Sequence, residues 1–283
     1  MVAGIRIALG IFVLLLWTLV LLPVQLIGIR FALPVRLHLP RWWHLVARRV
    51  LGLRVTVHGT PATGRPLLLV SNHVSWKDIT VLGSVADVVY IAKTEVRTWP
   101  VFGWLARLQR SVFIEREKKR ETGRQITEVA ERLTAGEIVV LFAEGTTSDG
   151  NRILEFKSSL FGAASAALPF SEKGEVFVQP VAIAYTRVHG MPMGRYHRPI
   201  AAWPGDVALG PSLAGVLKEG AIDVDVCFGE AIRFTAESRR KDVARDCERS
   251  VRDMLNAQLR GRPAPDRAPG AAASAKAISS SPD

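Results

Sequence analysis

A long uncharged run near the amino terminus places the strongest limit on how this chain can fold. Residues 7–29 contain no Asp, Glu, Lys or Arg, and as a helix they would be about 35 Å long, enough to cross the hydrocarbon core of a bilayer. The run is too long for the hydrophobic core of a signal peptide, and no small-residue cleavage site follows it. We therefore expect an uncleaved membrane anchor at residues 1–31. Pro23, Gln25 and Gly28 leave open whether the helix spans the bilayer or enters one leaflet.

Basic residues flank this anchor unequally. Arg6 and the amino terminus precede it, and six arginines follow it: Arg30, Arg36, Arg41, Arg48, Arg49 and Arg54. Cytoplasmic flanks of membrane segments carry an excess of Lys and Arg. The sequence therefore predicts a protein of the cell inner membrane whose larger part faces the cytoplasm.

The linker at residues 32–52 combines tryptophan with arginine in a helix-length run that Pro40 opens. Trp42 and Trp43 would lie at the depth of the lipid headgroups, with the arginines on phosphates. An ordinary amphipathic helix packed on the core is the alternative, and the sequence does not decide between them.

Composition limits the partners and the chemistry. The chain has 283 residues, enough for one large domain with short extensions, and 37 Lys and Arg against 26 Asp and Glu give it a charge of +11. No nucleic-acid module is recognisable, so membrane lipids with anionic headgroups are the expected partners and nucleic acid is not. Cys227 and Cys247 have no paired spacing, which predicts neither a metal site nor a disulfide.

Beyond the linker, strand-like and helix-like apolar periods alternate. Strands are expected at residues 53–57, 66–70, 88–92, 112–114, 138–142, 176–184 and 224–228, and helices at 78–85, 101–108, 121–133, 157–168 and 236–259. This alternation predicts one layered α/β domain over residues 53–260, a mixed sheet flanked by helices. Gly, Pro, Ala and Ser dominate residues 261–283, for which we expect a disordered tail.

The segment NHVSWKD at residues 72–78 is the motif most informative about chemistry. His73 and Asp78 are five residues apart, so they can meet only if His73 lies in a turn and Asp78 in the first turn of the next helix. A carboxylate on one ring nitrogen would leave the other free to take a proton from a hydroxyl or water. A surface histidine and an aspartate that favours the helix dipole are the alternative. Ser75 is expected to cap that helix rather than to act as a nucleophile.

Three later segments complete a pattern: RSVFIER at residues 110–116, LFAEGTT at 141–147 and VQPV at 178–181. With NHxSxxD, their order and intervals resemble the glycerolipid acyltransferases that add a second acyl chain to lysophosphatidate, over roughly residues 40–235. The resemblance implies a single acyltransferase domain in which His73 and Asp78 are catalytic. It also implies an acceptor-binding set, to which Lys93 is added as a further candidate for the pocket lining: Arg116, Glu144, Gly145, Thr146 and Lys93.

The departures from the family pattern concern the acceptor. Arg110 stands where the family has glycine, Ala143 replaces a proline, and Thr147 replaces an arginine suited to a phosphomonoester. Residues 142–150 and 203–206 look similar to the branch that acylates lyso-ornithine lipid, whose headgroup is an amino acid. In the alternative interpretation Thr147 is a tolerated change, and Lys157 or Arg152 supplies the charge. Lysophosphatidate is slightly favoured, as the commoner acceptor.

The resemblance and the missing motifs together suggest direct transfer. There is no Gly-x-Ser-x-Gly elbow and no cysteine in a nucleophile context. His73 would take the proton of the lysolipid hydroxyl, which attacks the thioester of acyl-CoA or acyl carrier protein, while Asp78 stabilises the imidazolium. No metal and no resident cofactor are expected. A thioesterase that activates water, or a non-catalytic membrane-binding protein, remain the alternatives from other classes.

Overall fold

A computed structural model describes residues 2–115, 119–198, 201–203 and 209–262 of the chain. In this part of the chain, one sheet of nine strands has the order β1-β8-β6-β2-β5-β3-β4, and the short strands β7 and β9 pair with β6. Strand β2 is parallel to β5 and β6, whereas β6 and β8 are antiparallel, so the sheet is mixed, as predicted. The strands are β1 Leu53–His58, β2 Leu67–Ser71, β3 Val88–Lys93, β4 Val112–Ile114, β5 Ile138–Phe142, β6 Val176–Val188, β7 Met191–Pro192, β8 Ile222–Phe228 and β9 Ile232–Phe234.

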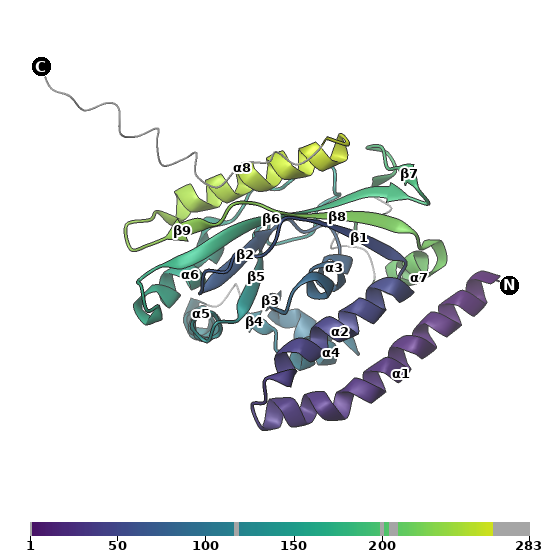
Figure 1. Cartoon of the computed structure of the whole chain (residues 1–283), viewed down its shortest axis with the longest axis horizontal. Helices are drawn as coiled ribbons and strands as arrows, with labels where there is room; N and C mark the ends of the chain where they lie inside the picture. The colour runs from purple at the N-terminus through teal and green to yellow at the C-terminus, as the bar shows by residue number, and fades with distance from the viewer. Residues whose placement is uncertain (1, 116–118, 199–200, 204–208, 263–283) are drawn as a thin grey trace, which may run out of the picture.

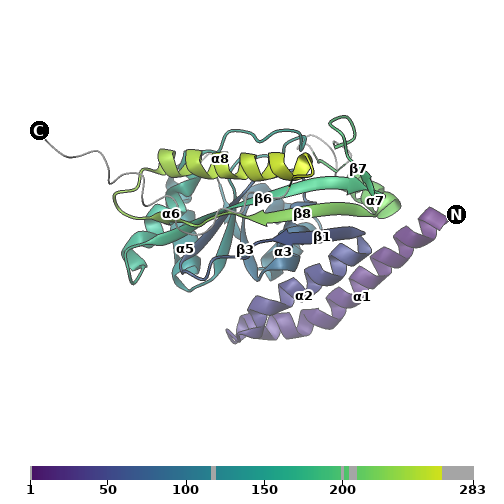
Figure 2. The same ribbon diagram turned by 45° about the horizontal axis from the view of Figure 1, so that its top comes forward.

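Helices cover both faces of the sheet. Helix α8 lies over one face, α3 and α2 lie under the other, and α1 lies outside α2 (Figures 1 and 2). The α-helices are α1 Val2–Arg30, α2 Val35–Val50, α3 Lys77–Val85, α4 Phe102–Leu108, α5 Lys119–Thr134, α6 Gly162–Ala167, α7 Leu209–Glu219 and α8 Arg240–Leu259. The α/β class and the N-terminal apolar helix predicted from the sequence are confirmed.

The central strand β2 is buried on both sides. Leu68 and Val70 belong to the core cluster under α8, whereas Leu67 and Leu69 belong to the cluster against α3. All four side chains are inaccessible to solvent, and each stabilises the fold by about 1.5–3 kcal/mol. The segment at residues 72–78 follows directly from the carboxyl end of this strand.

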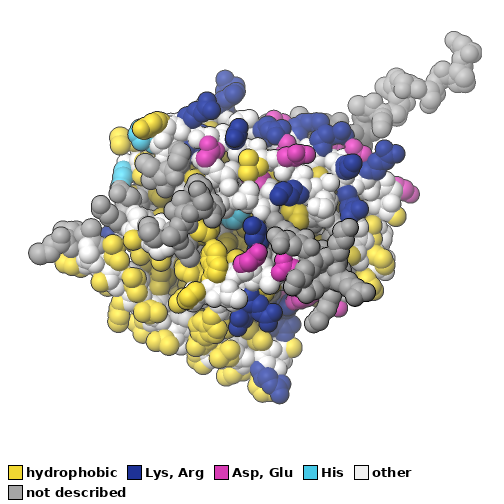
Figure 3. Space-filling model, turned by 180° about the vertical axis from the view of Figure 1, so that it is seen from behind, with side chains coloured by type: hydrophobic (Ala, Val, Ile, Leu, Met, Phe, Trp, Pro, Cys, Tyr) yellow, Lys and Arg dark blue, Asp and Glu magenta, His cyan; other side chains and the backbone are white. Residues whose placement is uncertain are grey.

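Helix α1 is the one described helix that is long and apolar enough to cross a membrane, by length and composition. Only 11% of its most apolar window is buried inside the protein. Hydrophobic side chains gather on the side of the molecule that contains α1 (Figure 3). The most exposed of them on α1 are Ile5, Leu9, Phe12, Leu15 and Leu19.

Helix α2 differs from the helix expected in the linker. It begins at Val35, and Pro40 lies inside it. Proline lacks an N–H, which frees the carbonyl one turn earlier, and Gln25 of α1 donates to that carbonyl, on Arg36, at 3.3 Å. Trp42 is half exposed, but Trp43 donates to Thr18 of α1 at 2.8 Å. Trp43 therefore packs between the two helices, as the alternative for this segment expects, and its depth relative to lipid headgroups stays a prediction.

Other element boundaries also shift. The helix expected at residues 157–168 is α6 between two 3-10 turns, Ser158–Phe161 and Leu168–Phe170. Helix α8 starts four residues later than expected, at Arg240. The sequence did not predict α7, because its Gly and Pro are typical of loops, yet Val216 and Leu217 are buried in the core. Most of the expected tail, residues 263–283, lies outside the described residues.

The contact between α2 and α3 gives a stability prediction. A Cβ added at Gly83 would lie 2.3 Å from Cδ2 of His44. The strain should exceed the gain in helix propensity of about 1 kcal/mol. Gly83→Ala should therefore lower the free energy of unfolding by about 1–2 kcal/mol. Unfolding is measured by circular dichroism in detergent micelles. In the His44→Ala background the same change should raise it. Equal effects in the two backgrounds would contradict the contact.

Candidate active site

The sheet brings two of the sequence motifs to one edge. Strands β2 and β5 are parallel neighbours, with Ser71 opposite Phe142 at their carboxyl ends. The segment at residues 72–78 leaves the first strand and the segment at 143–149 leaves the second. Ligands of open α/β sheets bind outside the carboxyl ends of the strands, so this edge is the candidate active site.

Asn72 fixes the point at which the chain leaves the sheet. Its side-chain amide donates to the carbonyl of Ile183 at 3.0 Å and accepts from the N–H of the same residue at 2.8 Å. The buried amide thus continues the ladder between β2 and β6 by one step after the backbone pairing has ended. The turn that follows therefore starts from a fixed position.

His73 and Asp78 meet as the spacing predicts. His73 lies in the turn, α3 begins at Lys77, and Asp78 is in its first turn. Nδ1 of His73 is 2.8 Å from Oδ2 of Asp78, which assigns the ring proton to Nδ1 and leaves a lone pair on Nε2. Among the described residues, Nε2 has no hydrogen-bond partner. The arrangement can accept a proton from a hydroxyl placed at Nε2.

Ser75 lies two residues before α3, whose cap position is Trp76 with no side-chain cap hydrogen bond. The capping role expected for Ser75 is therefore not found. Its Oγ is 3.4 Å from the backbone nitrogen of Lys77, a long contact, and 2.9 Å from Nζ of the same lysine. The hydroxyl is completely buried. Ser75 therefore contacts the start of α3, and its stronger bond is to the lysine side chain.

The Asp78 carboxylate is completely buried and surrounded by donors. Besides His73, Oδ2 accepts the backbone N–H groups of Val74 at 2.7 Å and Ser75 at 2.9 Å. The hydroxyl of Tyr185 donates to Oδ1 at 2.7 Å. These hydrogen bonds offset the cost of burying the carboxyl group. Sequence reasoning missed Tyr185, although a tyrosine in the apolar strand β6 needs a buried partner for its hydroxyl.

Phe142 limits the motion of the His73 imidazole. The rings of His73 and Phe142 are stacked, with centroids 4.0 Å apart and planes 13° from parallel. The side chain of His73 is only 18% exposed. The ring is therefore held by the stack on one face and by the bond at Nδ1.

Glu144 points inward, in contrast to the acceptor-binding role that the resemblance implies. Oε1 accepts the backbone N–H of His73 at 2.8 Å and Oε2 accepts that of Leu154 at 3.0 Å. Burial raises the pKa of Glu144 to about 7, although these two N–H groups act to lower it. Both oxygens are thus engaged by backbone, and the side chain supports the turn that holds His73.

The other expected acceptor residues lie at different depths. Gly145 forms the turn with a φ of 74°, a conformation that favours glycine, and Thr146 is exposed at its tip. Lys93 is exposed at the end of β3, two strands from β2 in the sheet order and therefore about 10 Å away. Arg116 lies outside the described residues.

Two further segments cover the His73 turn. The N–H of Ser148 donates to the carbonyl of His73 at 2.8 Å, and that of Trp203 donates to the carbonyl of Val74 at 2.9 Å. Thr147, which replaces the family arginine, is half-buried between Thr146 and Ser148. The segments at residues 146–149 and at 203 therefore pack against the backbone of the His73 turn.

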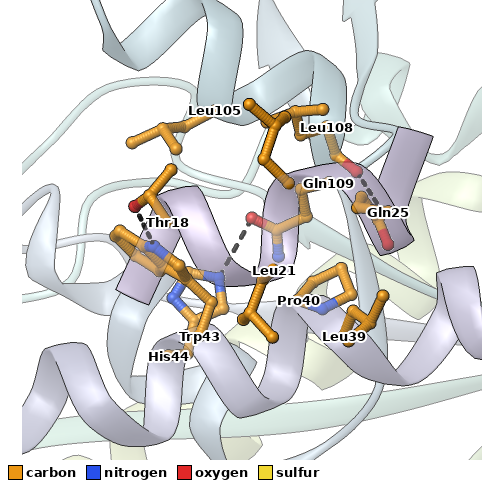
Figure 4. Close-up of a pocket in the computed structure, with 11 residues that line it drawn as sticks. Thr18, Leu21, Gln25, Leu39, Pro40, Trp43, His44, Leu105, Leu108 and Gln109 are labelled. Atoms are coloured by element: carbon orange, nitrogen blue, oxygen red, sulfur yellow. Dashed lines mark hydrogen bonds between the residues drawn. The ribbon is translucent and has the colours of Figure 1, made fainter. Parts of the chain in front are cut away.

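The cavity in Figure 4 is a separate feature, about 60 Å³ in volume, between α1, α2 and α4. Its polar wall is His44, whose Nε2 lies 3.1 Å from Oε1 of Gln109. Burial lowers the pKa of His44 to about 4, so the ring is neutral near pH 7. Neither His73 nor Asp78 lines this cavity.

The described residues offer neither a candidate metal site nor a reactive thiol. Among the described residues, no group of three or more His, Cys, Asp or Glu could hold a metal ion. Cys227 and Cys247 are free and buried, and burial raises their pKa values to about 11 and about 12. Both thiols are therefore protonated near neutral pH.

Comparisons with known proteins agree with this geometry. A family model described as acyltransferase matches residues 54–184. A lyso-ornithine lipid O-acyltransferase of Rhizobium meliloti is 57% identical over all of this chain and 96% of its own. The chain belongs to the acyltransferase family.

Two more distant matches place this acyltransferase among related enzymes. A 1-acyl-sn-glycerol-3-phosphate acyltransferase of Neisseria gonorrhoeae is 35% identical over 72% of this chain and 75% of its own. The crystal structure of a 1-acyl-sn-glycerophosphate acyltransferase from Thermotoga maritima has the same fold, with a TM-score of 0.57 and 22% identity over 89% of this chain and 96% of that one.

The position of Glu144 gives a kinetic prediction. In Glu144→Gln one of the two backbone N–H groups would face an amide N–H₂, so the His73 turn loses a hydrogen bond. We expect kcat of the acyltransferase to fall about tenfold or more while KM for the acceptor changes less than twofold, measured by steady-state kinetics. A rise in KM with kcat preserved would instead support acceptor binding by Glu144.

Proposed function

We propose that this acyltransferase, which acts on lysolipids, uses lyso-ornithine lipid as its acceptor. The observation that carries the proposal is the full-length similarity to the Rhizobium enzyme of that name. The sequence slightly favoured lysophosphatidate as the commoner acceptor. Similarity over the whole chain outweighs that general expectation, because the relative of the other class matches less of the chain and at lower identity.

The charges beside His73 support an amino-acid headgroup. Thr147 supplies no cation where the family has arginine, and the next exposed side chain in the turn is Asp149. Burial alone would raise the pKa of Asp149, but hydrogen bonds from Asn151 and the nearby charge of Arg152 lower it overall. An ionised carboxylate at this place suits the ammonium of an ornithine headgroup better than a phosphate.

The proposed reaction is direct acyl transfer. Nε2 of His73 takes the proton of the acceptor hydroxyl, the oxygen attacks the thioester carbonyl, and the thiolate of the donor leaves and is protonated. Asp78 stabilises the imidazolium that forms. The donor in this proposal is acyl-CoA or acyl carrier protein. A thioester is already an activated acyl donor. Positioning of the substrates and a neutral base can therefore supply much of the further lowering of the barrier that the reaction needs.

A parallel acceptor assay tests this proposal. Purified enzyme with a labelled acyl thioester receives lyso-ornithine lipid or lysophosphatidate, and the acylated products are separated by thin-layer chromatography. We expect product from lyso-ornithine lipid in the wild type and at least a hundredfold less with His73→Ala. Product from lysophosphatidate alone would overturn the acceptor, and free fatty acid without acylated lipid would favour a thioesterase.

Thr147→Arg is the matched specificity variant in the same assay. A new guanidinium beside His73 should increase the use of lysophosphatidate about tenfold, because a charge-assisted bond to phosphate is worth about 1.5–3 kcal/mol. Activity towards lyso-ornithine lipid should not rise. Unchanged use of lysophosphatidate would show that position 147 does not select the acceptor.

We further propose that α1 holds the enzyme at the inner membrane with the catalytic domain on the cytoplasmic side. The apolar exposed face of α1 supports membrane insertion, and the arginines that follow the helix support the cytoplasmic orientation. Acyl thioesters are soluble donors that the cytoplasm can supply.

Charged residues on the outer face of α1 test the anchor without removing its contacts to α2. Leu15 and Leu19 are 58% and 65% exposed. The double substitution Leu15→Lys with Leu19→Lys should move most of the protein out of the sedimented membrane fraction, since each lysine costs about 2.5–3.5 kcal/mol at the bilayer centre. Phe170→Lys, 69% exposed and on the catalytic domain, is the control. Unchanged sedimentation of the double variant would contradict insertion of α1.

A further inference from the structure

The helix that carries Asp78 also carries a buried lysine that the reaction does not use. Lys77 is inaccessible to solvent, and its Nζ donates to Oγ of Ser75 at 2.9 Å. No ion pair joins this lysine to a carboxylate among the described residues. Lysine is very seldom fully buried without a charged partner, so its position beside the dyad calls for an electrostatic explanation.

Tyr185 of β6 links this lysine to the dyad. Nζ of Lys77 lies over the Tyr185 ring, 5.7 Å from its centroid, and over the Trp76 ring at 5.4 Å. The hydroxyl of the same tyrosine donates to Oδ1 of Asp78 at 2.7 Å. A cation on the face of a phenol draws electron density from it and strengthens its hydroxyl as a donor. The side chains of Lys77, Tyr185, Asp78 and His73 therefore form one connected series of contacts.

We propose that Lys77 and Tyr185 are positioning residues that lower the basicity of His73 and keep its imidazole neutral at cytoplasmic pH. A buried carboxylate on Nδ1 favours the imidazolium, which cannot act as a base. A positive charge near the carboxylate and a strong donor on its second oxygen both reduce that effect. The inference rests on the role proposed for His73 as the general base.

The protonation state of Lys77 agrees with this role. Burial lowers the pKa of Lys77 to about 8, and the charge of Asp78 acts in the opposite direction. The ammonium form therefore predominates near pH 7. Burial, together with the charge of Asp78, raises the pKa of Tyr185 well above its ordinary value, so the phenol keeps the proton that it donates.

Other charged or titratable groups face the same turn. Their effects on His73 must be distinguished from those of Lys77 and Tyr185. Glu144, after β5, bonds the backbone of His73 and has a pKa of about 7. Tyr90 of β3 stacks on Phe142 and has a pKa well above its ordinary value. Asp149 belongs to one of the segments that cover the turn, and Arg198 donates to Asn151, two residues further along. Glu144 is the group among these whose pKa lies near neutral pH and whose side chain bonds His73 directly.

The experiment measures the His73 titration directly. The full chain in detergent micelles, labelled with ¹³C at Cε1 of its six histidines, is titrated by NMR, and the His73 signal is assigned by its absence in His73→Gln. Wild type, Lys77→Met and Tyr185→Phe are compared, each with native Glu144 and with Glu144→Gln. Ser84→Ala, which removes a buried hydroxyl from the same helix, is the control.

Loss of the lysine charge should raise the pKa of His73. A unit charge about 10 Å away shifts a pKa by about one unit at an effective dielectric constant near 20. We expect an upward shift of about one unit in Lys77→Met, a smaller upward shift in Tyr185→Phe and none in Ser84→Ala. Because the base must be neutral, the acid limb of kcat/KM should move to higher pH by the same amount while the alkaline plateau is retained.

An unchanged or lowered His73 pKa in Lys77→Met would overturn the proposal. If that variant does not fold, Tyr185→Phe decides, since it removes a single oxygen, and the absence of an upward shift there would overturn the proposal equally. The NMR titration needs no acceptor. An incorrect acceptor would therefore appear in the product assay and leave this result standing.

Discussion

The buried carboxylate of Asp78 is the interaction on which the rest of the site depends. It receives a ring N–H, two backbone N–H groups and a phenol hydroxyl. An isolated carboxylate in this position would cost several kcal/mol in desolvation, and four donors offset that cost. One side chain thus joins the start of α3, the His73 turn and strand β6. Removal of any donor affects the imidazole as well as the fold of the turn.

Glu144 holds the same turn from the opposite side. It binds the backbone N–H of His73, while Asp78 binds those of Val74 and Ser75. The carbonyls of His73 and Val74 accept from Ser148 and Trp203. Every backbone N–H of the three-residue turn is therefore engaged by a side-chain carboxylate, which supplies the pairing that buried backbone groups require. A rigid turn keeps Nε2 at one position, and a general base needs that geometry before its pKa matters.

Local signals in the sequence were enough for the dyad and for seven of the nine described strands, but not for the short strands β7 and β9 that pair with β6. The spacing of His73 and Asp78 requires a turn followed by a helix, and sequence and structure agree because both residues belong to one short segment. Tyr185 and Glu144 reach the dyad from 107 and 71 residues away, and no local pattern indicates which way such side chains turn. The same limit explains Trp43 and α7, whose positions follow from packing against α1 and the sheet.

The order of the helices connects the anchor to the chemistry. Helix α2 lies between α1 and α3 (Figure 2), and the ring of His44 lies directly against Gly83 of the helix that carries Asp78. Gln25 of α1 donates both to the carbonyl of Arg36 in α2 and, at 2.6 Å, to that of Leu108 in α4. With α1 inserted as proposed, this packing would set the orientation of α3, and hence of His73, relative to the bilayer. The direction from which a lysolipid hydroxyl approaches Nε2 in the proposed reaction would then follow from the packing of α1, α2 and α3.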